Sequence, residues 1–195
     1  MMVADRILNL LFPPKCTLCG KVLEKEETDL CRDCRVNSPE CPGKHKNFSF
    51  LDSWAAVWYY EENIRSSLLR YKFRHARHYA PVYGRFLAMR ILQEYPDGFD
   101  VLTWVPISRL RRLTRGYDQV ELLADAVGQE LGMASLPCLK KIRNNRPQSG
   151  ITGQAKRRAH VLSEDRRAWP EGILGSRVRL PQDVITTRAP AGECA

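Results

Sequence analysis

Four cysteines near the N-terminus constrain this 195-residue chain more than any other feature. They form two Cys-x-x-Cys pairs, Cys16 with Cys19 and Cys31 with Cys34, and eleven residues separate the pairs. Two such knuckles aim four thiolates at one ion, and tetrahedral Zn–S bonds of about 2.3 Å then close the site. Because four thiolates leave no open position for water, the pattern predicts structural rather than catalytic zinc.

The segment between the two pairs, residues 20–30, is polar and predicts a surface hairpin. A loop of this kind buries no core, so we expect the metal to supply most of the folding free energy of this module. A redox role for the cysteines is the alternative. A redox Cys-x-x-Cys usually occurs singly, at the start of a helix in a strand–helix unit, which favours zinc here.

Three of the seven cysteines lie outside the pairs. Cys41 is followed by His45, which suggests part of a second metal site, but no second pair accompanies them and a peripheral free thiol is the simpler interpretation. Cys138 and Cys194 are expected to be small apolar fillers. Clustered cysteines are typical of metal ligands in a reducing compartment, so we expect a cytoplasmic protein.

The N-terminal apolar stretch does not resemble a targeting segment. It is too short for a signal peptide and lacks a small-residue cleavage site. It predicts a short amphipathic helix over residues 4–12, which Pro13 ends. No run in the chain approaches the roughly 18 apolar residues of a membrane span, so no such span is expected.

The net charge of +9 is unevenly distributed. Residues 1–45 carry seven basic and seven acidic side chains, whereas residues 46–195 carry 24 basic and 15 acidic ones. The excess concentrates in residues 65–115, with eleven basic against three acidic, and in residues 140–158, with seven basic and none acidic. A basic face of this density suits nucleic acid or a polyphosphate ligand, and a solvated surface without a ligand is the alternative.

Two domains are expected: an N-terminal helix with the zinc module over residues 1–45, and a larger domain over residues 46–195. Their boundary falls within a linker expected at residues 40–50. Alternating strands and helices in the larger domain predict an α/β fold with a mostly parallel sheet. The clearest helix has a periodic apolar stripe that ends at Gly132. The expected strands are 54–60, 100–108, 136–143 and 176–187, and the expected helices are 62–71, 80–94 and 117–132.

Ligands of open α/β sheets bind outside the carboxyl ends of the strands. Three loops are expected to meet there, at residues 105–119, 143–158 and 182–188. They hold many guanidinium groups and small hydroxyl side chains, which suit phosphate oxygens. The sequence therefore predicts a polyanion or phosphate site at this edge of the sheet.

Four stretches together resemble the ComF family of bacterial competence-associated proteins. These are FPPKCTLCG with LCRDC, RYKFRH, VPISRLRRLTRGYDQVELLA and RPQSGITGQAKRRAHV, and the resemblance covers roughly residues 12–195. It implies a zinc ribbon followed by a type I phosphoribosyltransferase-like domain. It also implies a bacterial cytoplasmic role in DNA uptake or DNA use, with single-stranded DNA and DNA-uptake or helicase proteins as partners.

The resemblance further implies a site for phosphoribosyl pyrophosphate and Mg²⁺. In the family's motif an acidic pair binds the ribose hydroxyls, and a Thr-Thr-Gly-x-Thr turn binds the 5′-phosphate. Here the motif falls on residues 182–190 with three departures. The matching residues are Asp183, Thr186 and Thr187, and the departures are Gln182 for an acid, Arg188 for Gly and Pro190 for Thr.

The departures have physical costs. Arg188 places a Cβ where the turn requires a positive φ, at a cost on the order of 1 kcal/mol, although its guanidinium can meet the phosphate directly. Pro190 removes an N–H donor and a hydroxyl. The resemblance also implies a further helix and strand, so the domain is expected to be incomplete at its C-terminus, through a frameshift near residues 162–181 or through true divergence.

Two more elements are implied by the family. The pyrophosphate loop is implied at Val105, Pro106, Ser108 and Arg109. A flexible loop is implied at Arg115, Gly116, Gln119, Arg146, Gln148, Ser149 and Gly150. For Arg111, Arg112 and Arg115, solvent-facing helix residues are the alternative to phosphate ligands. For Asp183, a strand-end cap is the alternative to a ribose ligand.

Three functions remain open. The first is a competence protein whose phosphoribosyltransferase-type domain binds single-stranded DNA or partner proteins and also phosphoribosyl pyrophosphate. The second is an active phosphoribosyltransferase with an unknown acceptor, and the third is an inactive, truncated or frameshifted paralogue. Tyr71, Phe73 and Tyr117 are candidates for base stacking, with core packing as the alternative. His75 and His78 are expected to be surface groups.

Overall fold

The fold is given by a computed structural model that describes residues 12–45, 52–141, 162–164 and 178–179. The helix expected over residues 4–12 lies outside the described residues, apart from its last residue. The elements are α2 (Arg32–Asn37), α3 (Glu62–Phe73), the 3₁₀ helix η1 (Arg77–Tyr79), α4 (Ala80–Glu94), β1 (Val101–Thr103), α5 (Arg109–Arg115), α6 (Gln119–Leu131), β2 (Ser135–Leu136), β3 (Leu139–Lys141), β4 (Leu162–Glu164) and β5 (Val178–Arg179).

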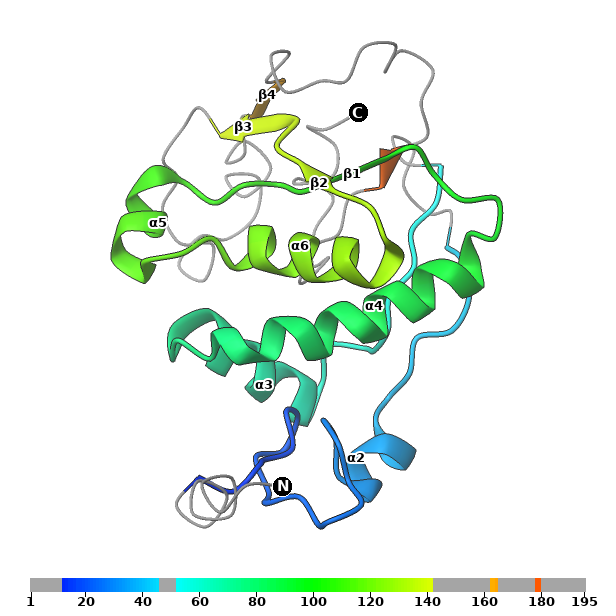
Figure 1. The fold of residues 1–195 in the computed structure, drawn as a ribbon, viewed down its shortest axis with the longest axis vertical. Helices are drawn as coiled ribbons and strands as arrows, with labels where there is room; N and C mark the ends of the chain where they lie inside the picture. Colours follow the sequence, from blue (N-terminus) through cyan, green and yellow to red (C-terminus); the bar gives the residue numbers. More distant parts are fainter. Residues whose placement is uncertain (1–11, 46–51, 142–161, 165–177, 180–195) are drawn as a thin grey trace.

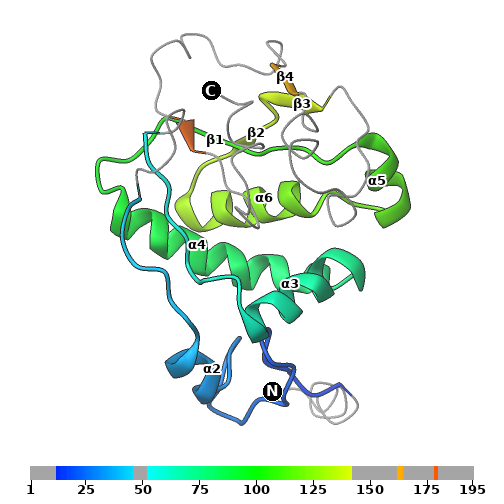
Figure 2. The ribbon, with the colours of Figure 1, turned by 180° about the vertical axis from the view of Figure 1, so that it is seen from behind.

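The elements stack in layers (Figure 1). The sheet lies on α6, α6 packs on α4, and the cysteine module with α2 lies below α3. Figure 2, the reverse view, shows the same order. Helix α6 therefore lies between the sheet and the other long helices.

The expected parallel sheet is present but small. Its strand order is β2-β1-β5, and both pairings of β1 are parallel, with Leu102 opposite Ser135 and Val101 opposite Val178. All three residues of β1 are buried, as the apolar run predicted. β1 reaches β2 through α5 and α6, the crossover that a parallel pair requires. A separate antiparallel pair, β3 with β4, completes the described strands.

The helices expected from periodicity are confirmed. α3 and α4 begin and end within two residues of their predicted bounds, and α4 has proline in its first turn. The apolar stripe of α6 is buried, and Gly132 ends the helix with φ +68. α4 and α6 cross closely at Gly84, where an added Cβ would lie 2.6 Å from Ala126 Cβ.

The predicted strand over residues 54–60 is wrong. Only Trp54 and Trp58 pair, through isolated antiparallel bridges to His45 and Glu40. Pro42 lies between those two partners, and because proline has no N–H donor the ladder cannot continue through it. Trp58 packs against the core instead, with its ring 4.9 Å from that of Phe86, whereas the Trp54 ring stacks on that of His45 at 4.3 Å.

The predicted strand over residues 136–143 is divided in two. β2 belongs to the parallel sheet, whereas β3 pairs with β4. Pro137 separates them, and the Cys138 N–H donates to the Leu136 carbonyl at 2.9 Å in a tight turn that redirects the chain. Residues 109–115, expected as part of a ligand loop, form helix α5.

The cysteine module shares its core with the larger part of the chain. Leu18 and Leu30 are 1% and 2% exposed and belong to one cluster with Ile64 and Leu68 of α3. The expectation that residues 20–30 bury no core is therefore wrong at Leu30. Among the described residues, no helix combines the length and apolar composition that a membrane crossing requires.

Candidate metal centre and cationic surface

The first cysteine pair lies on a tight hairpin. Lys15 and Val22 form an antiparallel bridge, and the Gly20 N–H donates to the Cys16 carbonyl at 2.8 Å. Gly20 has φ +80, a conformation that costs glycine little. The turn brings the side chains of Cys16 and Cys19 to the same side of the hairpin.

The second pair lies at the start of α2. Cys31 precedes the helix without capping it by its side chain, and Cys34 is in the first turn. Glu27 accepts hydrogen bonds from the N–H groups of Glu24 at 2.9 Å and Arg32 at 2.6 Å, and these bonds lower the pKa of its carboxyl. Glu27 therefore caps α2 and holds the polar loop against the knuckle.

The four predicted metal ligands converge. The Sγ atoms of Cys16, Cys19, Cys31 and Cys34 all lie within 4.8 Å of one another, and the Cys19–Cys31 pair is 3.7 Å apart. A regular tetrahedron with Zn–S bonds of about 2.3 Å has edges of about 3.8 Å. The donor set and its spacing thus fit a four-thiolate zinc site, which would hold the ribbon together and leave no position for a reacting water.

The environment of these thiols is uneven. Burial raises the pKa of the Cys34 thiol and also that of Cys19. Burial has the same direction at Cys16, but backbone N–H groups of Cys19, Cys31 and Leu18 outweigh it and lower the pKa of Cys16 to about 7. A thiolate is the metal-binding form, so metal entry is expected to release protons from Cys19 and Cys34, whose thiols are neutral more readily than that of Cys16.

Cys41 and His45 do not extend into a second complete site. The Cys41 Sγ lies 3.5 Å from the His45 Nε2, and Cys41 is buried. Within the described ranges, the paired cysteines are the sole group of three or more potential metal ligands. The expectation of a peripheral thiol agrees with this geometry, and Cys138 is buried as expected.

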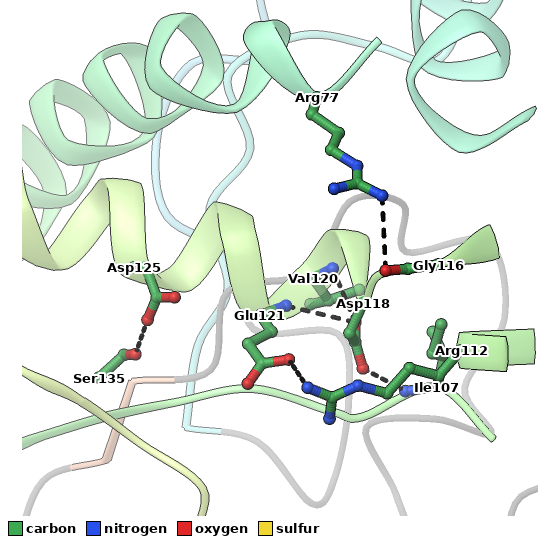
Figure 3. A network of polar contacts seen from close by, with 9 residues as sticks. All are labelled: Arg77, Ile107, Arg112, Gly116, Asp118, Val120, Glu121, Asp125 and Ser135. Carbon is green, nitrogen blue, oxygen red and sulfur yellow. Dashed lines mark hydrogen bonds and ion pairs between the residues drawn. The ribbon is translucent and has the colours of Figure 1, made fainter. Parts of the chain in front are cut away.

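The loop implied for pyrophosphate follows β1 and is held by Asp118, which was not among the expected site residues. Asp118 is buried, and its carboxylate accepts from the Ile107 N–H at 2.8 Å (Figure 3). The same carboxylate caps α6 through the N–H groups of Val120 and Glu121. An aspartate just before a periodic apolar run is a helix-start signal, so this cap was predictable.

The residues implied for a flexible loop are placed in two ways. Arg115 ends α5, Gly116 caps it with φ +73, and Gln119 begins α6. The Arg115 guanidinium donates to the Gln119 side-chain carbonyl at 2.7 Å, so this bond joins the end of α5 to the start of α6 across the short connection between them. The other implied ligands lie outside the described residues: Arg146, Gln148, Ser149, Gly150, Gln182, Asp183, Thr186, Thr187 and Arg188.

Basic side chains gather where α5 approaches the end of α3 and η1; we call this region, residues 72–79 and 109–116, the cationic surface. The Arg115 guanidinium lies 4.9 Å from the centre of the Phe73 ring, which is 62% exposed. Arg77 lies 4.4 Å from the Tyr117 ring and donates to the Gly116 carbonyl (Figure 3). Neither segment contains an acidic residue.

Two arginines of the basic run over residues 65–115 have structural partners instead. Arg85 pairs with Asp29 at 2.5 Å, and Arg90 contacts Glu40 and Glu94. These guanidiniums join α4 to the ribbon and to the segment after it. The solvated-surface interpretation is therefore wrong for these two arginines, and it remains the alternative for the exposed ones.

The candidate stacking residues differ in exposure. Tyr71 and Tyr117 are buried, and each hydroxyl donates to a backbone carbonyl at 2.6 Å, so these two belong to the core. Phe73 is exposed. His75 and His78 are exposed, as predicted. Arg112 is exposed and pairs with Glu121 at 3.1 Å.

Comparison with known proteins agrees with this geometry at the N-terminus. Residues 7–44 match the family described as double zinc ribbon domain. The chain is also 28% identical over 112 residues to Competence protein ComFC of Bacillus subtilis (strain 168), and the aligned part covers 57% of this chain and 44% of that relative. No solved structure matches the chain, so the phosphoribosyltransferase-like domain stays a prediction. The chain is a ComF-like protein with an N-terminal zinc ribbon.

Proposed function

We propose that this ComF-like protein acts in DNA uptake or DNA use by binding single-stranded DNA on its cationic surface. The observation that carries the proposal is the exposed Phe73 ring beside the Arg115 guanidinium, where two chain segments without an acidic residue of their own approach each other. Proteins that bind single strands combine a basic track for the backbone with aromatic rings on which bases stack.

The surface favours single strands over duplex because apolar and basic groups alternate on it. Leu110 and Leu113 of α5 are 61% and 81% exposed, and they lie among the arginines of the same helix. Unpaired bases expose apolar faces that such side chains can contact. A duplex buries those faces in its stack and presents mainly phosphate.

Binding of phosphoribosyl pyrophosphate with Mg²⁺ is a second candidate function. It is supported by the loop after β1, where the Asp118 carboxylate holds the Ile107 N–H and Ser108 leads into α5. In a phosphoribosyl transfer, pyrophosphate leaves C1′ while Mg²⁺ neutralises its oxygens and an acceptor attacks. Arg109, exposed at the start of α5, is the residue we assign to pyrophosphate.

Fluorescence anisotropy with a labelled single-stranded oligonucleotide tests the first function, with the matching duplex as competitor. Phe73→Ala is expected to weaken single-strand binding by about 1–3 kcal/mol, or about 5- to 150-fold. Arg109→Ala is expected to lower the slope of log K against log salt by about 0.7.

Arg65→Ala is the matched control, because it removes one charge from the exposed side of α3 some distance from Phe73. Equal binding by the Phe73→Ala and wild-type proteins, or equal preference for duplex, would contradict the proposal. Calorimetric titration with phosphoribosyl pyrophosphate and Mg²⁺ tests the second function separately, and absence of heat there rejects only that function. If the protein binds neither single-stranded DNA nor phosphoribosyl pyrophosphate, the inactive paralogue is the remaining interpretation.

A further inference from the structure

Helix α3 contacts the first zinc knuckle directly. The Arg70 Nη2 donates to the carbonyl oxygens of Thr17 at 3.0 Å and Leu18 at 2.6 Å. The Ser67 hydroxyl, one turn earlier on α3, also donates to the Thr17 carbonyl. Thr17 and Leu18 are the two residues between Cys16 and Cys19. Two side chains of α3 therefore bind the backbone that connects the first pair of metal ligands.

These contacts act on the sulfur through planar peptide units. The Thr17 carbonyl and the Leu18 N–H belong to one peptide, and the Leu18 carbonyl and the Cys19 N–H belong to the next. Each peptide is planar and includes the Cα atoms on both of its sides, so fixing the Leu18 carbonyl also fixes the Cα of Cys19, from which the sulfur ligand projects. The guanidinium therefore restricts where this sulfur can lie.

Arg70 is itself held in place. Its Nε donates to the Tyr79 hydroxyl of η1 at 3.3 Å, and the Thr17 and Leu18 residues that it contacts are 3% and 1% exposed. A carbonyl left unpaired in such a site loses a charge-assisted hydrogen bond without gaining water. The arrangement has the features of an outer-shell partner that orients metal ligands.

The same helix reaches the cationic surface. Phe73 ends α3 one turn after Arg70, and η1, which binds Arg70 through Tyr79, carries Arg77 of that surface. Leu18 of the knuckle also packs in one core cluster with Ile64 of α3. Loss of the knuckle would therefore remove both the hydrogen-bond partners and the packing partner of α3.

We infer that Arg70 is a positioning residue for the metal centre and that, through α3, zinc occupancy and single-stranded DNA affinity are coupled. The second part rests on the proposed function. Coupling of this kind is reciprocal: zinc raises DNA affinity by the same factor by which DNA raises zinc affinity.

Zinc transfer from the loaded protein to a chromophoric chelator tests the first part. Arg70→Ala is expected to weaken zinc retention about 10- to 100-fold, the usual effect of removing an outer-shell partner, and Arg70→Lys is expected to lie between it and wild type. Tyr71→Phe is the matched control, because it removes a hydrogen bond of α3 to the Gln119 carbonyl and leaves the bonds of Arg70 to Thr17 and Leu18 in place. Zinc retention by Tyr71→Phe within twofold of wild type would show that the loss in Arg70→Ala reflects ligand positioning rather than a general loss of stability.

Retention by Arg70→Ala within twofold of wild type would overturn the positioning role. If that variant does not fold, Ser67→Ala, which removes the other donor to Thr17, takes its place by the same criterion. The absorption spectrum of the Co²⁺-substituted protein provides a second readout, since its thiolate bands are expected to shift in the variant and not in Tyr71→Phe.

Single-strand binding measured with and without zinc tests the second part. Affinity is expected to fall on zinc removal, and the fall is expected to be smaller in Arg70→Ala. Equal affinity with and without zinc overturns the coupling alone. Absence of binding by the zinc-loaded wild type overturns both the coupling and the proposed function, whereas zinc transfer still decides the role of Arg70.

Discussion

Replacement of Asp118 is predicted to disconnect the loop after β1 from α6. The carboxylate is 3% exposed and accepts three backbone N–H groups, those of Val120 at 2.9 Å, Glu121 at 3.3 Å and Ile107 at 2.8 Å (Figure 3). Two of these bonds cap the helix through one oxygen, and the third reaches back to the loop through the other. Alanine removes all three.

The expected cost has two parts. Loss of an N-cap costs about 0.5–2 kcal/mol. An N–H donor left without its charged acceptor costs about 1–3 kcal/mol. Because Ile107 is partly exposed, we expect the lower half of this range for its N–H group. Asp118→Ala is therefore expected to lower the free energy of unfolding by about 2–4 kcal/mol. Asp118→Asn keeps one carbonyl oxygen for the cap and is expected to cost about 1–2 kcal/mol.

Urea unfolding of the zinc-loaded protein measures these differences, and hydrogen exchange at the Ile107 amide reports the loop. Asp125→Ala is the matched control, because Asp125 lies on the same helix, is exposed and accepts from the Ser135 hydroxyl (Figure 3). The control is expected within about 0.5 kcal/mol of wild type. An Asp118→Ala protein equally close to wild type, or an Asn variant as damaged as the Ala variant, would refute the reasoning.

Three further predictions concern packing, metal and pH. Gly84→Ala places a Cβ 2.6 Å from Ala126 Cβ, so overpacking of about 1–3 kcal/mol is expected to exceed the roughly 1 kcal/mol gained in helix propensity. Thermal melting measures it, with the exposed Gln93→Ala on the same helix as control; a raised melting temperature for Gly84→Ala would count against the close crossing. Cys34→Ser is expected to reduce bound zinc below half an equivalent by metal analysis, whereas Cys138→Ala retains one equivalent; a wild-type protein with less than half an equivalent would contradict the four-thiolate site. Burial raises the pKa of the Glu121 carboxyl despite the nearby Arg112, so folding favours the neutral form of this group. The contribution of the neutral carboxyl to the free energy of unfolding is therefore lost as pH rises through the folded-state pKa. The urea concentration at the unfolding midpoint is accordingly expected to be higher for Glu121→Gln than for wild type at pH 7. The two midpoints are expected to be equal well below the ordinary pKa of 4.5. A lower midpoint for Glu121→Gln at pH 7 would show that the ion pair with Arg112 outweighs burial.

Features that depend on residues a few positions apart in the chain were predicted correctly. The metal ligands follow from cysteine spacing, and α3, α4 and α6 follow from apolar residues at helical intervals. Helix α5 was expected only as an alternative for its arginines, because Leu110 and Leu113 are the two apolar residues in 109–115 and form no longer apolar stripe. The strand expected over residues 54–60 was wrong because its partner segment contains Pro42, which a strand's own composition does not reveal.

The chain by itself determined which sulfurs converge and which helices form, because both depend on side chains a few residues apart. Only the tertiary structure decided what the arginines do. Arg70 meets carbonyls 53 and 52 residues earlier in the chain, Arg85 meets a carboxylate 56 residues earlier, and Arg115 lies over the Phe73 ring. A guanidinium binds carbonyl, carboxylate or aromatic ring with comparable readiness, so its partner is chosen by which group packing brings within reach.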